Sequence, residues 1–188
     1  MAEFRAESFA YSLAMIFETE RLIVRPWSLD DAEAALRMYG DVEVMRYLGR
    51  NGAGAVIGSV EEMKERLGKA IEKYQGDYLY AAIVPKDESD PVGTVLLKPL
   101  ELSSGGPAEE IEIGWHLARA YWGKGYGTEA GRGVMEHGFK HLPVNELHAI
   151  AYPENKASLR IMQKLSMEYQ GSTDQYYGVT TEHYIMRK

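Results

Sequence analysis

The segment spanning residues 111–138 constrains the fold of this chain more than any other part of its 188 residues. It reads IEIGWHLARAYWGKGYGTEAGRGVMEHG, a strand pattern followed by a glycine-rich turn and then a helix pattern. Gly123, Gly125 and Gly127 can adopt backbone angles closed to other residues, and N–H groups at a helix start bind anions with the help of the helix dipole. The segment predicts an anion site suited to a phosphorylated cofactor. The alternative is a tight turn that needs glycine for its geometry alone.

The predicted strand over 110–117 has two unlike faces. Side chains alternate along a strand, so one face carries Ile111, Ile113, Trp115 and Leu117. The other face carries Glu112, Gly114 and His116. An acid beside a glycine is unusual in a core strand, and the glycine lets another group approach the backbone closely. Glu112 is therefore a candidate for chemistry.

The remaining periodicities predict a mixed α/β sheet with helices on both faces. Further strand patterns cover 16–25, 78–84, 92–97, 147–152, 168–173 and 182–187. Helix patterns cover 42–48, 125–141 and 156–165, and two more follow the capping pairs Ser28/Asp31 and Ser59/Glu62. The inward positions of those two helices are Ala32, Ala35, Leu36 and Tyr39 in the first and Val60, Met63, Leu67, Ile71 and Tyr74 in the second. We expect one domain over 16–188 preceded by a tail over 1–15, and a mobile loop over 49–58.

Composition excludes several classes of protein. The chain has 21 basic and 28 acidic residues, a net charge of −7, which disfavours nucleic-acid binding and mildly favours an amine-bearing partner. It has no cysteine, which rules out disulfides, a thiolate nucleophile and cysteine-ligated metals. No apolar run has the length of a membrane span, and the first residues lack the apolar core of a signal peptide. We expect a cytoplasmic protein without a membrane partner.

Two other motifs in the sequence have competing interpretations. Gly125-x-Gly127-x-x-Ala130 matches the dinucleotide fingerprint, which keeps a nicotinamide oxidoreductase as an alternative. That fingerprint normally follows a nearly all-apolar strand, whereas this strand carries Glu112 and His116. His137 and His141 stand four positions apart, as zinc ligands on a helix do. They have no obvious third ligand, so no metal is expected.

A longer part of the sequence resembles the GNAT acetyltransferase superfamily. Its acyl-CoA-binding pattern, Gln/Arg-x-x-Gly-x-Gly/Ala after a strand, resembles Trp122–Gly127, with Trp122 at the Gln/Arg position. ETERLIVRP (18–26), DVEVMRYLG (41–49) and NKASLRIMQKLSMEYQG (155–171) are similar to segments of the branch that contains ribosomal-protein N-terminal acetyltransferases. Ser166 departs from the usual glycine after the last helix and would occupy a left-handed turn at some energetic cost.

The resemblance implies a GNAT-type fold with a largely antiparallel sheet and acetyl-CoA as the cosubstrate. In this superfamily the strand before the glycine loop carries a bulge and splays from the next strand, and the pantetheine arm pairs with its backbone. The matching backbone positions here are Trp115 and Leu117, and the loop amides from Gly123 to Thr128 would hold the pyrophosphate. The full set of implied cofactor-binding residues is Trp115, Leu117, Trp122, Gly123, Lys124, Gly125, Tyr126, Gly127, Thr128, Asn155 and Ser158.

Two residues are candidates for catalysis. Glu112 is the candidate general base, acting through a water, and the alternatives are a carboxylate that orients the amine or a buried ion-pair partner. Ser158 is the candidate hydrogen-bond donor to the departing thiolate, and Asn155 would face the same end of the cofactor. The alternative for both is a role at a helix N-terminus, with Asn155 as the cap. Without cysteine an acetyl-cysteine intermediate is impossible, so direct attack in a ternary complex is expected.

The resulting expectation is an N-acetyltransferase that acts on a primary amine. By resemblance the acceptor is a protein N-terminus, followed by a small amine such as an amino acid, a polyamine or an aminocyclitol. The acceptor site is expected from the first two helices, the 49–58 loop and the segment near Tyr176, where Tyr177 and Tyr184 either line a cleft or pack in the sheet. The second hypothesis is a non-catalytic acyl-CoA-binding module. A monomer or homodimer is expected.

Overall fold

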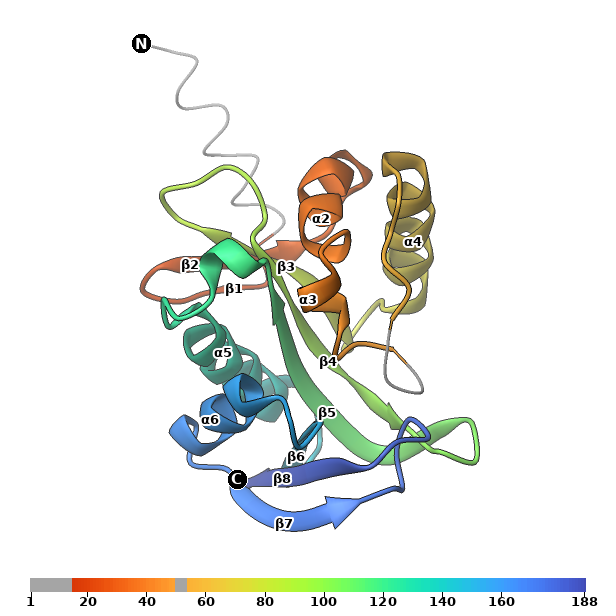
Figure 1. Ribbon diagram of the computed structural model, residues 1–188. Helices are drawn as coiled ribbons and strands as arrows, with labels where there is room; N and C mark the ends of the chain where they lie inside the picture. The colour runs from red at the N-terminus through yellow and green to blue at the C-terminus, as the bar shows by residue number, and fades with distance from the viewer. Residues whose placement is uncertain (1–14, 50–53) are drawn as a thin grey trace.

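The computed structural model describes residues 15–49 and 54–188. In these ranges the chain forms an eight-stranded sheet in the order β1-β2-β3-β4-β5-β6-β8-β7 (Figure 1). The strands are β1 (Phe17–Glu18), β2 (Leu22–Pro26), β3 (Leu79–Pro85), β4 (Gly93–Glu101), β5 (Pro107–Leu117), β6 (Glu146–Ala151), β7 (Glu168–Thr173) and β8 (Thr181–Arg187). All neighbours are antiparallel except β5 and β6. The prediction of a mixed, largely antiparallel sheet is confirmed, whereas residues 1–14 of the expected tail lie outside the described residues.

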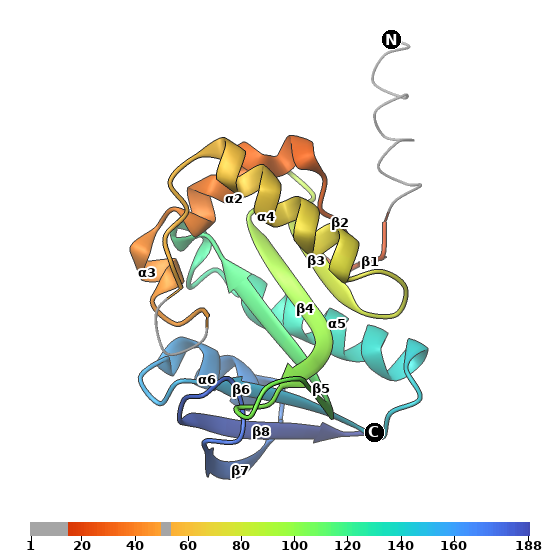
Figure 2. The same cartoon turned by 90° about the vertical axis from the view of Figure 1, so that its right-hand side faces the viewer.

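Helices cover both faces of the sheet, as the sequence predicted (Figures 1 and 2). One face packs against α5 (Tyr126–His141) and α6 (Lys156–Lys164). The other face packs against α2 (Ala32–Tyr39), α3 (Val42–Met45) and α4 (Val60–Lys73). Two short 3₁₀ turns, η1 (Leu29–Asp31) and η3 (Arg119–Tyr121), precede α2 and the glycine loop.

Alternation along the strands divides the interior into two apolar clusters. Toward α5 and α6 the sheet contributes the inward residues Ala81, Ile83, Val95, Leu97, Ile111 and Ile113. Toward α2 and α4 it contributes Ala82, with the partly buried Tyr80 beside it. Met63 and Leu67 of α4 are fully buried there, which confirms the inward face predicted for that helix. The polar face of β5, with Glu112 and His116, therefore lies on the α2–α4 side.

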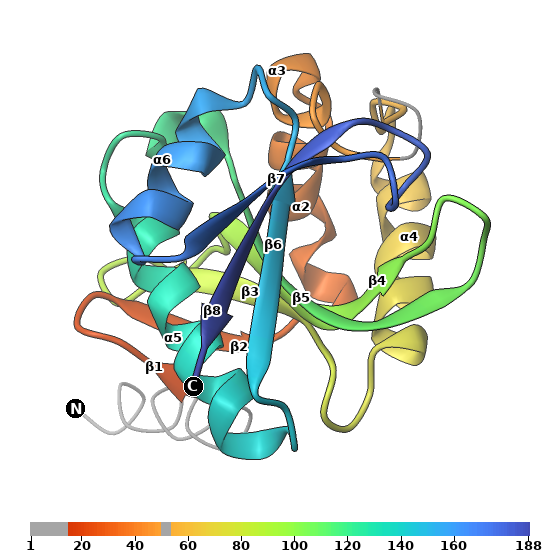
Figure 3. The ribbon, with the colours of Figure 1, turned by 90° about the horizontal axis from the view of Figure 1, so that it is seen from below.

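The parallel neighbours β5 and β6 diverge. They share one residue pair, Glu112 with His148, whereas β4 and β5 pair in an unbroken register from Gly93 opposite Leu117 to Pro99 opposite Ile111. Figure 3 shows β6 and β8 crossing the direction of β5. The expected splay between β5 and β6 is therefore present. The register of the β4–β5 pairing shifts at the hairpin end of the two strands, between Pro99 and Glu101 of β4.

The structure corrects three local predictions. The strand expected over 16–25 is a hairpin, β1 and β2, because the Thr19 N–H donates to the carbonyl of Leu22 at 2.9 Å and the Thr19 hydroxyl accepts from the Leu22 N–H at 3.1 Å. The helix expected over 42–48 ends at Met45, and Gly49 then adopts φ 88°. The helix expected from Ser28 begins with the 3₁₀ turn η1. Ser166 adopts φ 61°, which confirms the left-handed turn expected there.

Candidate functional site

A cavity of about 460 Å³ opens where β5 separates from β6. Its floor is the polar face of β4 and β5, and its walls come from α4, from the segment after α3, from the N-terminal part of α6 and from the β7–β8 loop. Glu112, Trp115, Asn155 and Ser158 all line it. The structure thus brings together four residues that the sequence placed in the site from two separate segments, β5 and the start of α6.

Glu112 is the centre of a three-residue cluster in this cavity. Lys98 lies opposite it on β4, and the Lys98 Nζ is 2.7 Å from Glu112 Oε2. The Tyr177 hydroxyl donates to the same oxygen at 2.5 Å, and Lys98 also donates to the Tyr177 hydroxyl. Both partners converge on Oε2, which leaves Oε1 without a hydrogen-bond partner among the described residues.

Tyr177 is held in an unusual backbone position. Its φ is 56°, and its N–H donates to the carbonyl of Glu101 at 2.9 Å. Burial, followed by the neighbouring Glu112 carboxylate, raises the pKa of Tyr177 well above its ordinary value. The phenol is therefore a permanent donor to Glu112. Of the three tyrosines considered for the cleft, Tyr177 lines the cavity, whereas Tyr176 and Tyr184 are buried.

A second polar cluster supports the other end of the cavity. The Tyr39 hydroxyl lies 2.7 Å from that of Tyr80, 2.8 Å from Thr94 Oγ1 and 3.2 Å from His116 Nδ1. Burial, assisted by the charges of Arg66 and Lys98, lowers the pKa of His116 to about 3. His116 is therefore neutral at physiological pH and serves as a hydrogen-bonding group in this cluster.

The glycine loop presents unpaired backbone amides. Gly123 and Gly125 have φ 75° and 87°, a region that side chains disfavour, and Gly125 is the N-cap of α5. The N–H groups from Gly123 to Gly127 donate to no acceptor in the described part of the chain, whereas the Thr128 N–H donates to the carbonyl of Gly125 at 3.1 Å. The amides at 123–127 fit a pyrophosphate; the expected contribution of Thr128 is reduced by its own turn.

Arg21 fixes this loop from the β1–β2 hairpin. Its guanidinium donates to Glu129 Oε2 and to the carbonyl of Lys124, at 2.7 and 3.0 Å, and lies 4.7 Å from the centre of the Tyr126 ring. Glu129 Oε1 also accepts from the Thr19 hydroxyl at 2.6 Å. The hairpin and the first turn of α5 therefore form one unit.

The backbone of β5 is exposed beyond its single pair with β6. Because the Ala118 N–H donates to Val92 on the β4 side, alternation directs the backbone groups of Trp115 and Leu117 toward the β6 side. The Trp122 indole N–H donates to the Leu117 carbonyl at 2.7 Å. Trp122 thus has a loop-bracing contact that the sequence did not predict, and the Trp115 backbone is the more open of the two edges.

Asn155 and Ser158 lie at the N-terminus of α6. Asn155 caps the helix, since its Oδ1 accepts from the Ser158 N–H at 3.2 Å. This is the helix-capping alternative considered for Asn155. The Ser158 hydroxyl makes no hydrogen bond with any described residue and lines the cavity, so it is free to meet a ligand.

Sequence reasoning missed several residues that line the cavity: Tyr47, Arg66, Tyr74, Lys98 and Tyr152. Lys98 shares a strand face with Thr94 and Leu96, but its meeting with Glu112 depends on the hairpin register. Tyr152 follows β6 three positions before Asn155, outside the 155–171 segment in which the sequence indicated Asn155 and Ser158. Of the predicted acceptor segments, the end of the 41–49 segment and the Tyr177 loop reach the cavity, and residues 50–53 lie outside the described residues.

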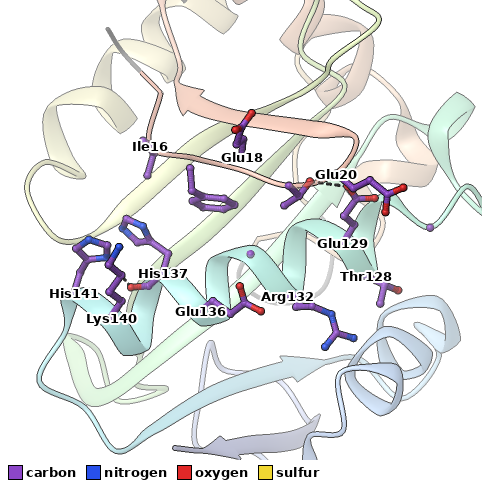
Figure 4. Close-up of a pocket in the computed structure, with 14 residues that line it drawn as sticks. Ile16, Glu18, Glu20, Thr128, Glu129, Arg132, Glu136, His137, Lys140 and His141 are labelled. Atoms are coloured by element: carbon purple, nitrogen blue, oxygen red, sulfur yellow. Dashed lines mark hydrogen bonds between the residues drawn. The ribbon is translucent and has the colours of Figure 1, made fainter. Parts of the chain in front are cut away.

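A second hollow, of about 590 Å³, follows the outer side of α5 beside β1. Figure 4 shows Arg132, His137 and His141 along the helix, with His137 directed toward the segment that carries Glu18 and Arg132 directed away from it. The two histidine rings stack at 4.0 Å. Across residues 15–49 and 54–188, no three His, Asp or Glu side chains are grouped to hold a metal ion. None of the helices described combines the length and apolarity needed to cross a bilayer.

The comparisons with known proteins agree with this geometry. A family model described as an acetyltransferase (GNAT) domain matches residues 21–168. The chain therefore belongs to the GNAT acetyltransferase family.

Individual relatives are distant. The uncharacterized N-acetyltransferase p20 of Bacillus licheniformis is 28% identical over 84% of this chain and 85% of its own length. The structure of a ribosomal-protein-S5-alanine acetyltransferase from Vibrio fischeri superposes with a TM-score of 0.71 and 19% identity over 91% of this chain and 95% of that one. The structure of RimL, a ribosomal L7/L12 α-N-protein acetyltransferase solved with coenzyme A, superposes with a TM-score of 0.71. The two chains are 15% identical over 92% of this chain and 97% of RimL. The GNAT fold is thus shared with enzymes of the branch that the sequence resembles.

Proposed function

We propose that this acetyltransferase moves the acetyl group of acetyl-CoA directly to a primary amine in a ternary complex. The observation that carries the proposal is the continuity of the site. Unpaired amides of Gly123–Gly127, the open backbone edge at Trp115 and the cavity around Glu112 follow one another along β5 and α5. A phosphorylated, amide-bearing donor fits the first two features, and the third receives the acceptor.

The proposed cofactor contacts divide by chemistry. The 123–127 amides would hold the pyrophosphate, and the Trp115 backbone would pair with the pantetheine amides. Lys124 adds a positive charge beside the loop, with its Nζ 4.6 Å from the centre of the Tyr121 ring. Bound acetyl-CoA would supply an activated acetyl carbonyl and a thiolate leaving group.

The chain's own groups would manage the protons. Glu112 Oε1, which has no hydrogen-bond partner in the described part of the chain, would accept the amine proton through a water while Lys98 and Tyr177 hold Oε2 in place. A backbone N–H of β5 would stabilise the developing oxyanion. The free hydroxyl of Ser158 would donate a hydrogen bond to the departing sulfur. A protein N-terminus or a small amine is the proposed acceptor, since an α-amino group with a pKa of about 8 needs only modest help to lose its proton.

The donor site is tested by calorimetric titration with acetyl-CoA, with NADH as the control ligand. Gly123→Asn and Gly123→Asp form a matched pair, because both residues tolerate positive φ and a Cβ at Gly123 meets nothing within 4 Å. Only Asp adds a negative charge near the phosphates. We expect Asn to retain most of the affinity and Asp to lose at least tenfold. Equal affinity of the two variants, or binding of NADH alone, would refute the donor site.

The catalytic roles are tested by following CoA release. The chain has no cysteine, so a thiol reagent reports CoA without background from the protein. Glu112→Gln and Ser158→Ala should bind acetyl-CoA like the wild type and acetylate amines more slowly, by about 100-fold or more for Glu112→Gln. An unchanged acetylation rate in Glu112→Gln would show that this carboxylate is only a buried ion-pair partner and takes no part in catalysis.

A further inference from the structure

The charges around the acceptor cavity are arranged in two groups. Lys98, Glu101 and Glu112 lie together at the hairpin end of β4 and β5, and the charge of Glu101 acts on the Tyr177 phenol beside Glu112. Arg66 of α4 is the cation on the opposite wall.

The guanidinium of Arg66 stacks on an aromatic ring. Its guanidinium carbon lies 4.7 Å from the centre of the Tyr39 ring, and it interacts electrostatically with Tyr80 and His116. Within the described ranges it forms no ion pair. Part of the guanidinium edge is directed at the Tyr80 hydroxyl, and the other N–H groups of an arginine stacked on a ring are available to a carboxylate.

The strand register gives the separation of the two ends. Tyr80 pairs with Leu96, which pairs with Gly114, and Lys98 pairs with Glu112 one row further along. Two residues along a strand span roughly 7 Å. The row of Tyr80, which Arg66 approaches, is thus on the order of 7 Å along the sheet from the Lys98–Glu112 pair. Arg66 and this pair line the same cavity, and the Leu96 side chain covers the floor above Gly114 between the two rows.

We infer that the acceptor is a primary amine that also carries a carboxylate, with the amine at the Glu112 end and the carboxylate on Arg66. This inference rests on the proposed function and narrows its acceptor. The arrangement disfavours polyamines and aminocyclitols, because a second cation would meet Arg66. The carboxylate is either the α-carboxylate of a free amino acid or an acidic side chain close to a peptide N-terminus, which share the same chemistry.

Binding is measured first, by titrating amines into the protein saturated with CoA. The ligands are glycine, β-alanine, 4-aminobutyrate and 5-aminovalerate, each beside its carboxamide, and the peptide amides Asp-Ala and Asn-Ala. We expect the acid of at least one matched pair to bind roughly 10- to 100-fold more tightly than its neutral partner. The preferred chain length reports the spacing, and a preference confined to the peptides identifies an acidic N-terminus as the source.

Arg66→Gln should abolish the preference for the acid while leaving the affinity for the carboxamide unchanged. Lys69→Gln is the matched control, since Lys69 is an exposed cation on the same helix that pairs with Glu65. Equal binding of acids and carboxamides to the wild type, or a preference that survives in Arg66→Gln, would overturn the inference.

CoA release with the same ligands separates the two proposals. Acids that bind through Arg66 without being acetylated would sustain the acid-binding site and refute the proposed function. Acetylation of acids and carboxamides at equal rates and affinities would sustain the proposed function and refute the assignment of Arg66.

Discussion

Lys98 of β4 and Glu112 of β5 form a buried ion pair, with Lys98 Nζ 2.7 Å from Glu112 Oε2 and side chains that are 13% and 10% exposed. The pair lies at the point where β5 and β6 last touch, since Glu112 also pairs with His148 across the sheet. The carboxylate that the sequence indicated for chemistry is therefore held by a side chain of β4, on a strand whose backbone pairs with both of its neighbours.

Lys98→Met should destabilise the fold strongly. Removing one partner of a buried pair leaves an uncompensated charge, which costs about 3–5 kcal/mol. The measurement is the free energy of unfolding from a urea titration. The double variant Lys98→Met with Glu112→Gln should recover much of the loss, because the remaining amide is neutral. A double variant no more stable than Lys98→Met would contradict this account.

His116 should make the fold sensitive to acid. Its pKa is lowered from 6.5 to about 3 by burial and then by the charges of Arg66 and Lys98. Above pH 6.5 both the folded and unfolded chains carry a neutral ring; below it the unfolded chain binds a proton that the folded chain refuses, so stability falls. One proton gives a slope of at most about 1.4 kcal/mol per pH unit.

Comparison of the wild type with His116→Gln isolates this effect from the titration of the carboxylates. Between about pH 6 and pH 4 the unfolding free energy of the variant should fall less steeply than that of the wild type, with both measured by denaturant titration. Parallel pH profiles would show that His116 is protonated as readily in the folded chain as in the unfolded one.

Two glycine-to-alanine changes should have opposite effects. A Cβ at Gly93 would lie 2.5 Å from the backbone carbonyl oxygen of His116 and 2.5 Å from Leu117 Cδ2, at the first pair of the β4–β5 ladder. Gly93→Ala should lose about 1–3 kcal/mol of stability or more. Gly68, inside α4, has no atom nearer than Leu29 Cδ2 at 3.9 Å, so Gly68→Ala should gain about 0.5–1 kcal/mol. Thermal midpoints that move in the same direction would contradict the prediction.

Arg21→Gln should weaken donor binding more than it weakens the fold. Arg21 is 45% exposed, so its ion pair with Glu129 contributes about 1 kcal/mol or less to stability. Its bond to the Lys124 carbonyl positions the loop amides. We expect a loss of several-fold in acetyl-CoA affinity with a thermal midpoint close to that of the wild type. Unchanged affinity would show that the loop holds its shape without this contact.

Much of the fold could be predicted from local patterns. The strand over 168–173 coincides with β7, and the Ser59 hydroxyl caps α4 by accepting from the Glu62 N–H at 3.1 Å. The two faces predicted for β5 are those observed. These features depend on residues near one another in the chain, where periodicity and capping act directly.

What could not be predicted depends on distant contacts. The turn between β1 and β2 is stabilised by a hydrogen bond from the Thr19 hydroxyl to Glu129, which lies 110 positions further along the chain. The meeting of Lys98 with Glu112 follows from a hairpin register that shifts after Pro99, and alternation fixes a side chain's face but not its partner. Arg66 faces the cavity because of how α4 crosses the sheet. The structure therefore brings the predicted segments around one cavity, and it adds Lys98 and Arg66, two charged residues that the sequence did not indicate.

The division between main-chain and side-chain recognition has a consequence for how such an enzyme changes over time. In the proposed function the donor is held mainly by peptide groups of β5 and the glycine loop, which most substitutions leave in place. The opposite wall consists of single side chains on α4 and in the loops. Few point mutations can therefore change which acceptor is bound while the acyl donor stays the same. Under this arrangement we expect acceptor specificity to diverge faster during evolution than donor specificity.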